Sequence, residues 1–161
     1  MELNKLERYW LTAVGMMLGA FVAATIVALI FFGIRLPSPV DRIDPQRLEE
    51  TVFANPGIRQ LAGNRYEAYV VAKSWAFEAG PDLGTPPVLR FPRGAEVTFY
   101  VTSKDVMHGF QIEGHTANLE LVPGQIAKTT VRFNRSGEYA IICNHYCGAG
   151  HSVMYATIRV E

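Results

Sequence analysis

The chain lacks an excess of charge of either sign. Its 15 Lys and Arg residues are balanced by 15 Asp and Glu residues, which gives a formal net charge of zero at pH 7. A nucleic-acid-binding protein usually carries a basic field, and this sequence has none. The G-x-G-x-x-G and P-loop motifs and the nucleophile elbow are also absent, as are internal repeats and low-complexity tracts. These absences argue against nucleic-acid binding and against the common enzyme folds that use those motifs.

Charge is missing altogether from one long apolar stretch, residues 10–34, which begins at Trp10 and ends at Ile34. As a helix this stretch would extend about 37 Å, and the hydrocarbon core of a bilayer is about 30 Å thick. The bases Lys5 and Arg35 flank it, and Trp10 suits a membrane interface. A cleaved signal peptide has an apolar part of only about 7–15 residues, followed by a small-residue cleavage site. The sequence therefore predicts a transmembrane anchor, but the flanking bases do not decide its orientation.

The composition changes after the apolar stretch, where prolines mark the exit from the membrane. We assign residues 1–36 to the anchor, residues 37–62 to a linker and residues 63–161 to a separate domain. Asp44 and Pro45 suit the N-cap and first position of a short helix that runs to Thr51 within the linker.

Beyond residue 62, apolar residues alternate with polar ones, and turn signals containing glycine separate the alternating runs. In residues 95–103, for example, Val97, Phe99 and Val101 alternate with polar neighbours. A period of two predicts half-buried β-strands. Short strands at this spacing, with no helical segment between them, predict an all-β sandwich or small barrel. The predicted strands cover residues 66–73, 95–103, 126–133, 138–142 and 155–160.

Cysteine is scarce, yet both cysteines lie in one short segment that also contains other soft donors. Cys143, Cys147, His151 and Met154 follow the spacing C-x3-C-x3-H-x2-M, in the loop between the last two predicted strands. A fifth candidate donor, His108, follows an earlier predicted strand. Strands hold the ends of both loops, so the sequence predicts one metal site built from these five side chains.

Three kinds of site could use these donors. A disulfide between Cys143 and Cys147 is sterically allowed, but it leaves the histidine and methionine without a role. A structural zinc ion needs four cysteine or histidine ligands and leaves Met154 unused. Copper uses thiolate, imidazole and a weak thioether, which is the ligand set of cupredoxin electron-transfer sites. We favour copper because it alone uses every donor.

The second thiolate exceeds the needs of a mononuclear copper site. Two sulfur atoms on one loop can bridge two copper ions, and each histidine can then cap one ion. Met154 would be a weak axial donor to one ion, and a main-chain carbonyl between the cysteines would serve the other. The sequence thus favours a binuclear site.

The segment resembles the CuA-binding domain of subunit II of the haem–copper cytochrome c oxidases. The matching residues are His108-Gly109-Phe110, Pro123-Gly124 and the stretch "CNHYCGAGHSVM", and the resemblance covers essentially the whole chain. The single N-terminal span is most similar to that of the B-type oxidases of thermophilic and related bacteria. The resemblance implies a cupredoxin-like Greek-key β-barrel or sandwich, preceded by one transmembrane helix.

The family's ligands carry over to this chain one residue at a time. The resemblance implies that Cys143 and Cys147 are bridging thiolates and that His108 and His151 each bind one copper ion of the CuA centre. The two weak ligands are then the thioether of Met154 and the main-chain carbonyl oxygen of His145.

Two further positions are interpreted through the same resemblance. Many family members have a glutamate in place of His145, and its side chain helps to hold a magnesium ion at the boundary with subunit I. Histidine makes that magnesium doubtful here. Trp75 aligns approximately with an aromatic segment near the copper site, so it is our candidate for the residue through which electrons enter.

The implied function is electron transfer in a respiratory chain, as a subunit of an oxidoreductase. Cytochrome c would donate electrons to the CuA centre, which would pass them to the haems of subunit I for reduction of O2 to water. The copper domain would then face the periplasm or the cell exterior, on a single-pass protein of the bacterial cell membrane. The partners are therefore subunit I, cytochrome c and membrane lipid.

Two alternatives stay open at this stage, namely a CuA subunit of a nitric oxide reductase and a copper-delivery module. Nitrous oxide reductase suits the sequence less well because it normally carries a large additional catalytic domain. A quinol oxidase subunit would lack the two thiolates.

Overall fold

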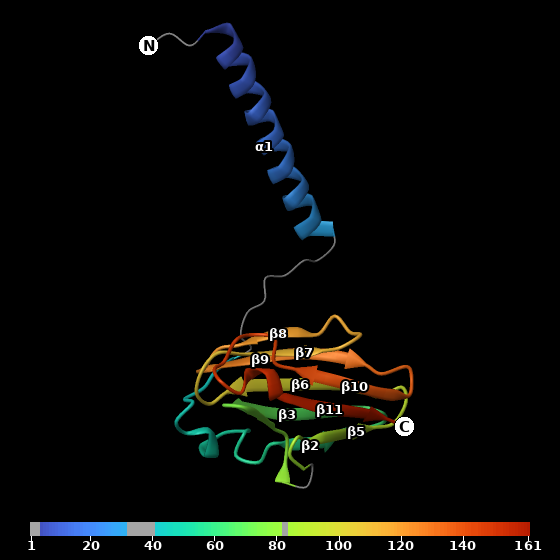
Figure 1. Ribbon diagram of the computed structural model, residues 1–161. Coiled ribbons are helices and arrows are strands. Elements are labelled where there is room, and N and C mark those ends of the chain that lie inside the picture. Colours follow the sequence, from blue (N-terminus) through green and yellow to red (C-terminus); the bar gives the residue numbers. More distant parts are fainter. Residues whose placement is uncertain (1–3, 32–40, 82–83) are drawn as a thin grey trace. The chain divides into compact units, whose positions relative to one another are not determined.

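The computed structural model describes residues 4–31, 41–81 and 84–161. These residues belong to two compact units, an N-terminal helix and a C-terminal β-domain (Figure 1). The helix, α1, spans Lys5–Phe31 and is long and apolar enough to cross a membrane. The predicted anchor coincides with α1 as far as Phe31, and residues 32–34 lie outside the described residues.

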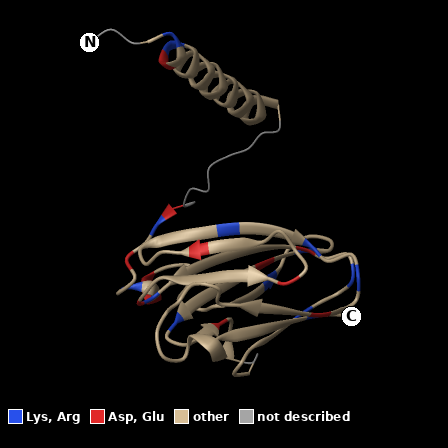
Figure 2. Ribbon diagram, turned by 45° about the horizontal axis from the view of Figure 1, so that its top comes forward, with Lys and Arg blue, Asp and Glu red and all other residues tan. Residues whose placement is uncertain are grey.

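Reciprocal hydrogen bonds define the start of α1. The Asn4 side-chain oxygen accepts from the Glu7 N–H, and the Glu7 carboxylate accepts from the Asn4 N–H, both at 2.9 Å. This pair satisfies two backbone donors that a helix leaves open at its first turn. The charged residues of α1 all lie at this end, and the remainder of the helix has none (Figure 2). The Thr12 and Thr25 hydroxyls donate to carbonyls four residues earlier, so they need no water as a partner.

The β-domain is a sandwich of two sheets (Figure 1). One sheet has six strands in the order β1-β9-β6-β3-β2, with β4 paired to β3, and the other has five in the order β5-β11-β10-β7-β8. The pairs β3–β6 and β5–β11 are parallel, and the remaining pairs are antiparallel. The bounds are β1 Asp41–Arg42, β2 Gly57–Gln60, β3 Arg65–Lys73, β4 Ala76–Glu78, β5 Val88–Phe91, β6 Glu96–Ser103, β7 His108–Ile112, β8 Asn118–Leu121, β9 Gln125–Arg132, β10 Gly137–Ile142 and β11 Tyr155–Val160.

The predicted sandwich is confirmed, and the five predicted strands correspond to β3, β6, β9, β10 and β11, each within a residue at either end. The sequence does not predict the other six strands. Because they contain only two to five residues each, a period of two has little length in which to show itself. Five of them pair directly with one of the longer strands, and β8 pairs with β7.

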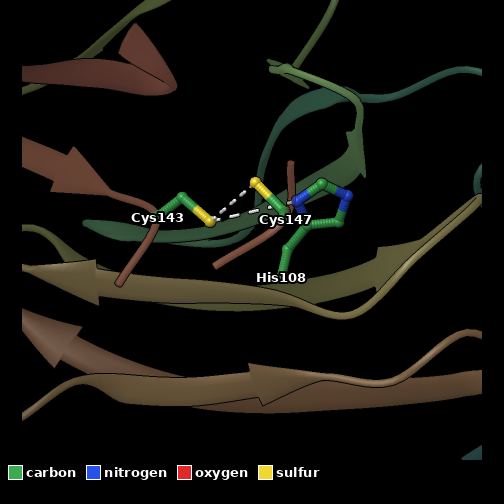
Figure 3. A group of neighbouring side chains, drawn as sticks. All are labelled: His108, Cys143 and Cys147. Atoms are coloured by element: carbon green, nitrogen blue, oxygen red, sulfur yellow. Dashed lines mark hydrogen bonds between the residues drawn. The ribbon is translucent and has the colours of Figure 1, made fainter. Parts of the chain in front are cut away.

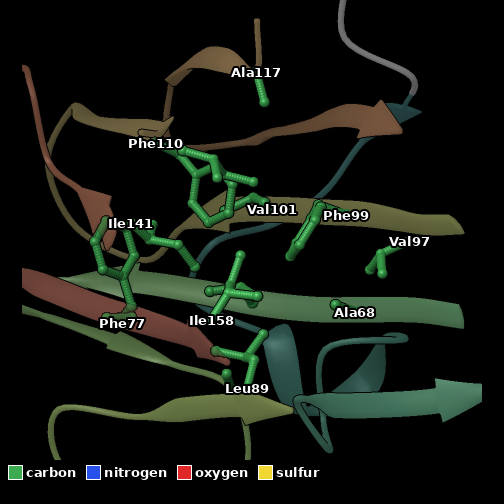
Figure 4. Close-up of a cluster of buried hydrophobic side chains, with 14 of the residues drawn as sticks. Ala68, Phe77, Leu89, Val97, Phe99, Val101, Phe110, Ala117, Ile141 and Ile158 are labelled. Carbon is green, nitrogen blue, oxygen red and sulfur yellow. The ribbon is translucent and has the colours of Figure 1, made fainter. Parts of the chain in front are cut away.

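The main core lies between the two sheets (Figure 4). Phe99 of β6 and Phe110 of β7 are fully buried, and their ring centroids are 5.5 Å apart. Leu89 and Ile158, from the parallel pair β5–β11, are also buried in this core. Each such side chain contributes about 1.5–3 kcal/mol by its burial, so the sandwich gives the loops at its edge a rigid support.

The chain between β1 and β2 covers the outer face of the six-stranded sheet. Leu48 and Phe53 pack there against Tyr69 and Val71 of β3, whose other face turns Ala68 and its alternate neighbours into the main core. Both faces of β3 are therefore buried, which explains its continuous run of buried residues.

The predicted linker thus contains ordered structure. It includes β1, β2 and a 3-10 helix, η1, at Leu48–Glu50, in place of the predicted helix from Asp44 to Thr51. Hydrogen bonds from the Arg47 N–H and the Gln46 N–H to Asp44 form a turn before η1. The boundaries drawn at residues 36 and 62 stay a prediction.

Candidate metal centre

The predicted donors meet at one end of strands β7, β10 and β11 of the five-stranded sheet. Cys143 directly follows β10, and Met154 directly precedes β11, so the two strands hold both ends of the cysteine loop. Before Met154 the chain forms a 3-10 helix, η3, at His151–Val153. His108 is the first residue of β7, which pairs with β10 through Ile142 and Gln111. This pairing brings His108 beside cysteines that lie far from it in the sequence.

The two cysteine sulfurs form the centre of the site (Figure 3). Both thiols are free and buried, and their Sγ atoms lie 3.6 Å apart. The Nδ1 atom of His108 lies 3.9 Å from the Cys143 Sγ. These three ligand atoms all lie within 4.8 Å of one another, so His108, Cys143 and Cys147 are positioned for a metal site.

The remaining predicted donors surround the same pair of sulfurs. The Nδ1 atom of His151 lies 3.6 Å from the Cys147 Sγ, and the Met154 Sδ lies 3.8 Å from it. On the other side, the main-chain carbonyl oxygen of His145 lies 3.2 Å from the Cys143 Sγ. The His145 side chain itself is exposed. Each sulfur thus has one imidazole and one weak donor close to it.

The Cys147 thiol of the metal-free protein is protonated at neutral pH. Burial, together with the hydrogen bond to Cys143, raises the pKa of the Cys147 thiol to about 11. Because the thiolate is the form that binds metals, a metal ion must displace this proton when it enters. Metal uptake at this site therefore releases protons.

An ionised carboxylate supports the buried histidine. Burial raises the pKa of the Asp105 carboxyl, but hydrogen bonds from His108, Ser74 and Val106 outweigh that effect and hold the pKa well below its usual range. Asp105 Oδ1 lies 2.8 Å from the His108 Nε2. Asp105 is not among the predicted site residues, although its position three residues before a candidate ligand is a signal that could have identified it.

Trp75 packs directly on the cysteine loop. Its indole Nε1–H donates to the Cys147 carbonyl oxygen at 2.9 Å. A Cβ atom added at Gly150 would lie 2.6 Å from the indole ring, and one at Gly148 would lie 3.0 Å from the Nε1 atom. The loop therefore requires glycine at both positions to accept the indole. The sequence indicates Trp75 as a candidate, but Gly148 and Gly150, which contact its indole, are not predicted.

Close packing also fixes the other side of the loop. Gly109 lies against the backbone of Asn144 and His145, and its N–H donates to the Cys143 Sγ at 3.4 Å. The Asn144 side-chain amide donates to Gln111 and Asn118, at 3.2 and 3.0 Å. The loop is thus tied to β7 and β8 by backbone and side-chain contacts.

The fold and the site together define a cupredoxin-like domain with a candidate metal centre rich in sulfur. Residues 59–161 match the family described as cytochrome c oxidase subunit II, periplasmic domain. The chain belongs to the cytochrome c oxidase subunit II family. It is accordingly a subunit of a haem–copper terminal oxidase, which is an oxidoreductase complex.

Two similar proteins cover nearly the whole chain, and a third covers part of it. Cytochrome c oxidase subunit 2 of Thermus thermophilus is 37% identical over 160 residues, which are 96% of this chain and 91% of the relative. A chain in the cryo-EM structure of a haem–copper terminal oxidase dimer matches with a TM-score of 0.71 at 29% identity, covering 98% of this chain and 100% of that one. The periplasmic domain of subunit II of the Bradyrhizobium japonicum cytochrome oxidase has a TM-score of 0.52 at 22% identity, covers 59% of this chain and 83% of that one, and shares the fold.

Proposed function

We propose that this chain holds two copper ions in a CuA centre and carries electrons from cytochrome c to the haems of the catalytic subunit, where O2 is reduced to water. Cys143 and Cys147 would bridge the two ions, and His108 and His151 would each bind one. The Met154 thioether and the His145 carbonyl oxygen would be the weak ligands. The observation that carries this proposal is the 3.6 Å separation of the two free cysteine sulfurs, with an imidazole beside each.

The chemistry of the donors fits copper better than zinc. A structural zinc site is complete with four cysteine or histidine ligands, which leaves no purpose for a buried thioether beside the sulfurs. Met154 is nevertheless buried, with its Sδ 3.8 Å from the Cys147 Sγ. Thiolate, imidazole and a weak thioether are the donors that copper electron-transfer sites combine.

The chain's own residues suit a site that must not rearrange. When bound here, copper would supply a one-electron carrier. Strands β7, β10 and β11 hold the ends of the ligand segments. The cysteine loop is also closely packed, because Trp75 lies against Gly150 and Gly109 lies against the Asn144 backbone. Side chains held in this way keep their geometry when the charge of the site changes, which favours fast electron transfer.

Exposed apolar side chains near the site support docking of cytochrome c. Trp75 is 42% exposed, Tyr146 82% and Val153 66%, and all three lie on or against the cysteine loop. The indole of Trp75 also donates to the Cys147 carbonyl, which supports Trp75 as the residue through which electrons enter. Basic and acidic side chains nearly balance after residue 36, so electrostatic steering contributes little to this docking.

The membrane topology follows from the same proposal. α1 would cross the bacterial cell membrane once, in contact with lipid, and the β-domain would face the periplasm or the cell exterior, where cytochrome c is found. The His145 side chain is exposed and is an imidazole, whereas magnesium prefers oxygen ligands, so we expect this side chain to bind no magnesium.

Rapid mixing of the copper-loaded full chain with reduced cytochrome c tests the function. We expect the copper centre to be reduced with a rate that changes little between low salt and about 0.15 M salt, since an apolar contact is insensitive to screening. The control is Cys147→Ser, which removes one bridging sulfur and should abolish electron uptake. Absence of reduction in the wild-type chain, or equal reduction of the serine variant, would contradict the proposal. A steep fall of the rate with salt would contradict the apolar docking surface.

A further inference from the structure

The carboxylate of Asp105 connects two parts of the metal centre that are otherwise separate. We infer that Asp105 is a positioning residue: it fixes the metal-binding tautomer of His108 and holds the segment that places Trp75 on the cysteine loop. This inference rests on the proposed function only in taking His108 as a metal ligand.

The hydrogen bonds of Asp105 use both carboxylate oxygens. Oδ1 lies 2.8 Å from the His108 Nε2 and accepts from the Val106 N–H at 2.7 Å. Oδ2 accepts from the Ser74 N–H at 2.7 Å. Because the three donors are divided between the two oxygens, a rotation of the carboxylate would break at least one of these hydrogen bonds. The orientation of Asp105 is therefore fixed by three donors.

The contact with Nε2 decides which nitrogen of His108 faces the metal. An ionised carboxylate only accepts hydrogen bonds, so Nε2 must carry the proton. In the neutral imidazole Nδ1 is then unprotonated, and Nδ1 is the atom that lies 3.9 Å from the Cys143 Sγ. A carboxylate behind a ligating histidine fixes its tautomer and raises its basicity. His108 is fully buried, so its ring is held among protein atoms.

The second histidine lacks such support within the described residues. The side-chain hydrogen bond of His151 joins its Nδ1 to the Cys147 Sγ, and its ring lies near the Tyr146 ring, with centroids 5.8 Å apart. His151 is only partly buried. The two imidazoles are therefore inequivalent, and His108 is the more strongly held.

The bond to Ser74 extends the effect of Asp105 to the other side of the cysteine loop. Ser74 directly precedes Trp75, whose indole donates to the Cys147 carbonyl. One carboxylate thus links His108 to the segment that contacts Cys147. Loss of this carboxylate should loosen the Trp75 segment as well as His108.

The first test uses the full chain without metal, in detergent micelles, with its four histidines labelled with ¹⁵N. In the wild-type protein the NMR spectrum should show His108 as the Nε2–H tautomer with a slowly exchanging proton. In Asp105→Ala we expect exchange of that proton to be at least tenfold faster, with a shifted Trp75 indole N–H signal. Glu113→Gln removes an exposed carboxylate at the opposite end of β7, and this matched control should resemble the wild type. This test does not depend on copper binding, so it separates the inference from the proposed function.

The second test uses the copper-loaded protein. Chelator-driven copper loss should be about 10–100-fold faster in Asp105→Ala than in Glu113→Gln. Asp105→Asn keeps an oxygen that can accept from the His108 Nε2 but loses the negative charge. The Nε2–H tautomer of His108 should therefore persist, and the reduction potential of the copper centre should rise. An unchanged tautomer and proton exchange in Asp105→Ala would overturn the inference. Should that variant fail to fold, exchange of the His108 Nε2 proton in Asp105→Asn as slow as in the wild type would overturn it instead.

Discussion

Replacement of Gly109 by alanine is the sharpest test of how the site is packed. The added Cβ would lie 1.9 Å from the Asn144 Oδ1, 2.8 Å from the Asn144 N and 2.9 Å from the His145 N. The amide side chain can turn away, but the two backbone nitrogens can move only with the cysteine loop. Restoring ordinary contact requires a shift of about 0.5–1 Å, and overpacking of this kind costs about 1–3 kcal/mol.

Two measurements follow from that displacement. For a small protein, a loss of about 2 kcal/mol lowers the urea midpoint by about 1 M, which Trp75 fluorescence can monitor. The absorption spectrum of the copper-loaded protein should also change, because the Gly109 N–H bond to the Cys143 Sγ moves with the loop. The control is Gly15→Ala in α1, where an added Cβ meets nothing within 4 Å and the midpoint of the β-domain should not change. If Gly109→Ala left both the midpoint and the spectrum unchanged, the packing described here would be wrong.

Three further predictions concern the donors and their surroundings. Trp75→Phe removes the indole donor to the Cys147 carbonyl. This variant should be reduced more slowly by cytochrome c, and its free energy of unfolding should fall by about 0.5–1.5 kcal/mol. An unchanged reduction rate would exclude Trp75 as the residue through which electrons enter. Met154→Leu keeps the buried volume and removes the thioether. A redox titration should therefore show a shifted reduction potential of the copper centre, while metal analysis should still find both copper ions. Loss of copper would contradict this prediction, because it would make Met154 a strong ligand. In the metal-free protein the pKa of the Cys147 thiol is raised to about 11, which leaves only about one thiolate in 10,000 at pH 7. The alkylation rate of Cys147 should therefore rise about tenfold per pH unit up to pH 10. A plateau of this rate below pH 9 would contradict that pKa.

The ligand loop and the long strands could be predicted because their signals are local. The spacing from Cys143 to Met154 is contained in one loop, and strands of eight or nine residues such as β3 and β6 are long enough to show a period of two. The resemblance to a known family added the assignment of the His145 carbonyl, which the structure places 3.2 Å from the Cys143 Sγ.

The features that the sequence did not reveal depend on contacts between distant segments. The covering of the outer sheet by Leu48 and Phe53 rests on two isolated apolar residues with no periodicity. The need for glycine at position 109 comes from the approach of Asn144, which is visible only when β7 and β10 are paired. In the sequence Asp105 is indistinguishable from an ordinary acidic residue of a loop. Only the fold brings the Ser74 N–H and the His108 ring within hydrogen-bonding distance of its two carboxylate oxygens.

Electron paramagnetic resonance of the copper-loaded, oxidised chain can show whether Cys143 and Cys147 jointly hold two copper ions. We expect two copper ions per chain by metal analysis and a hyperfine pattern from one unpaired electron shared by both nuclei. A single ion per chain with hyperfine splitting from one nucleus would contradict it.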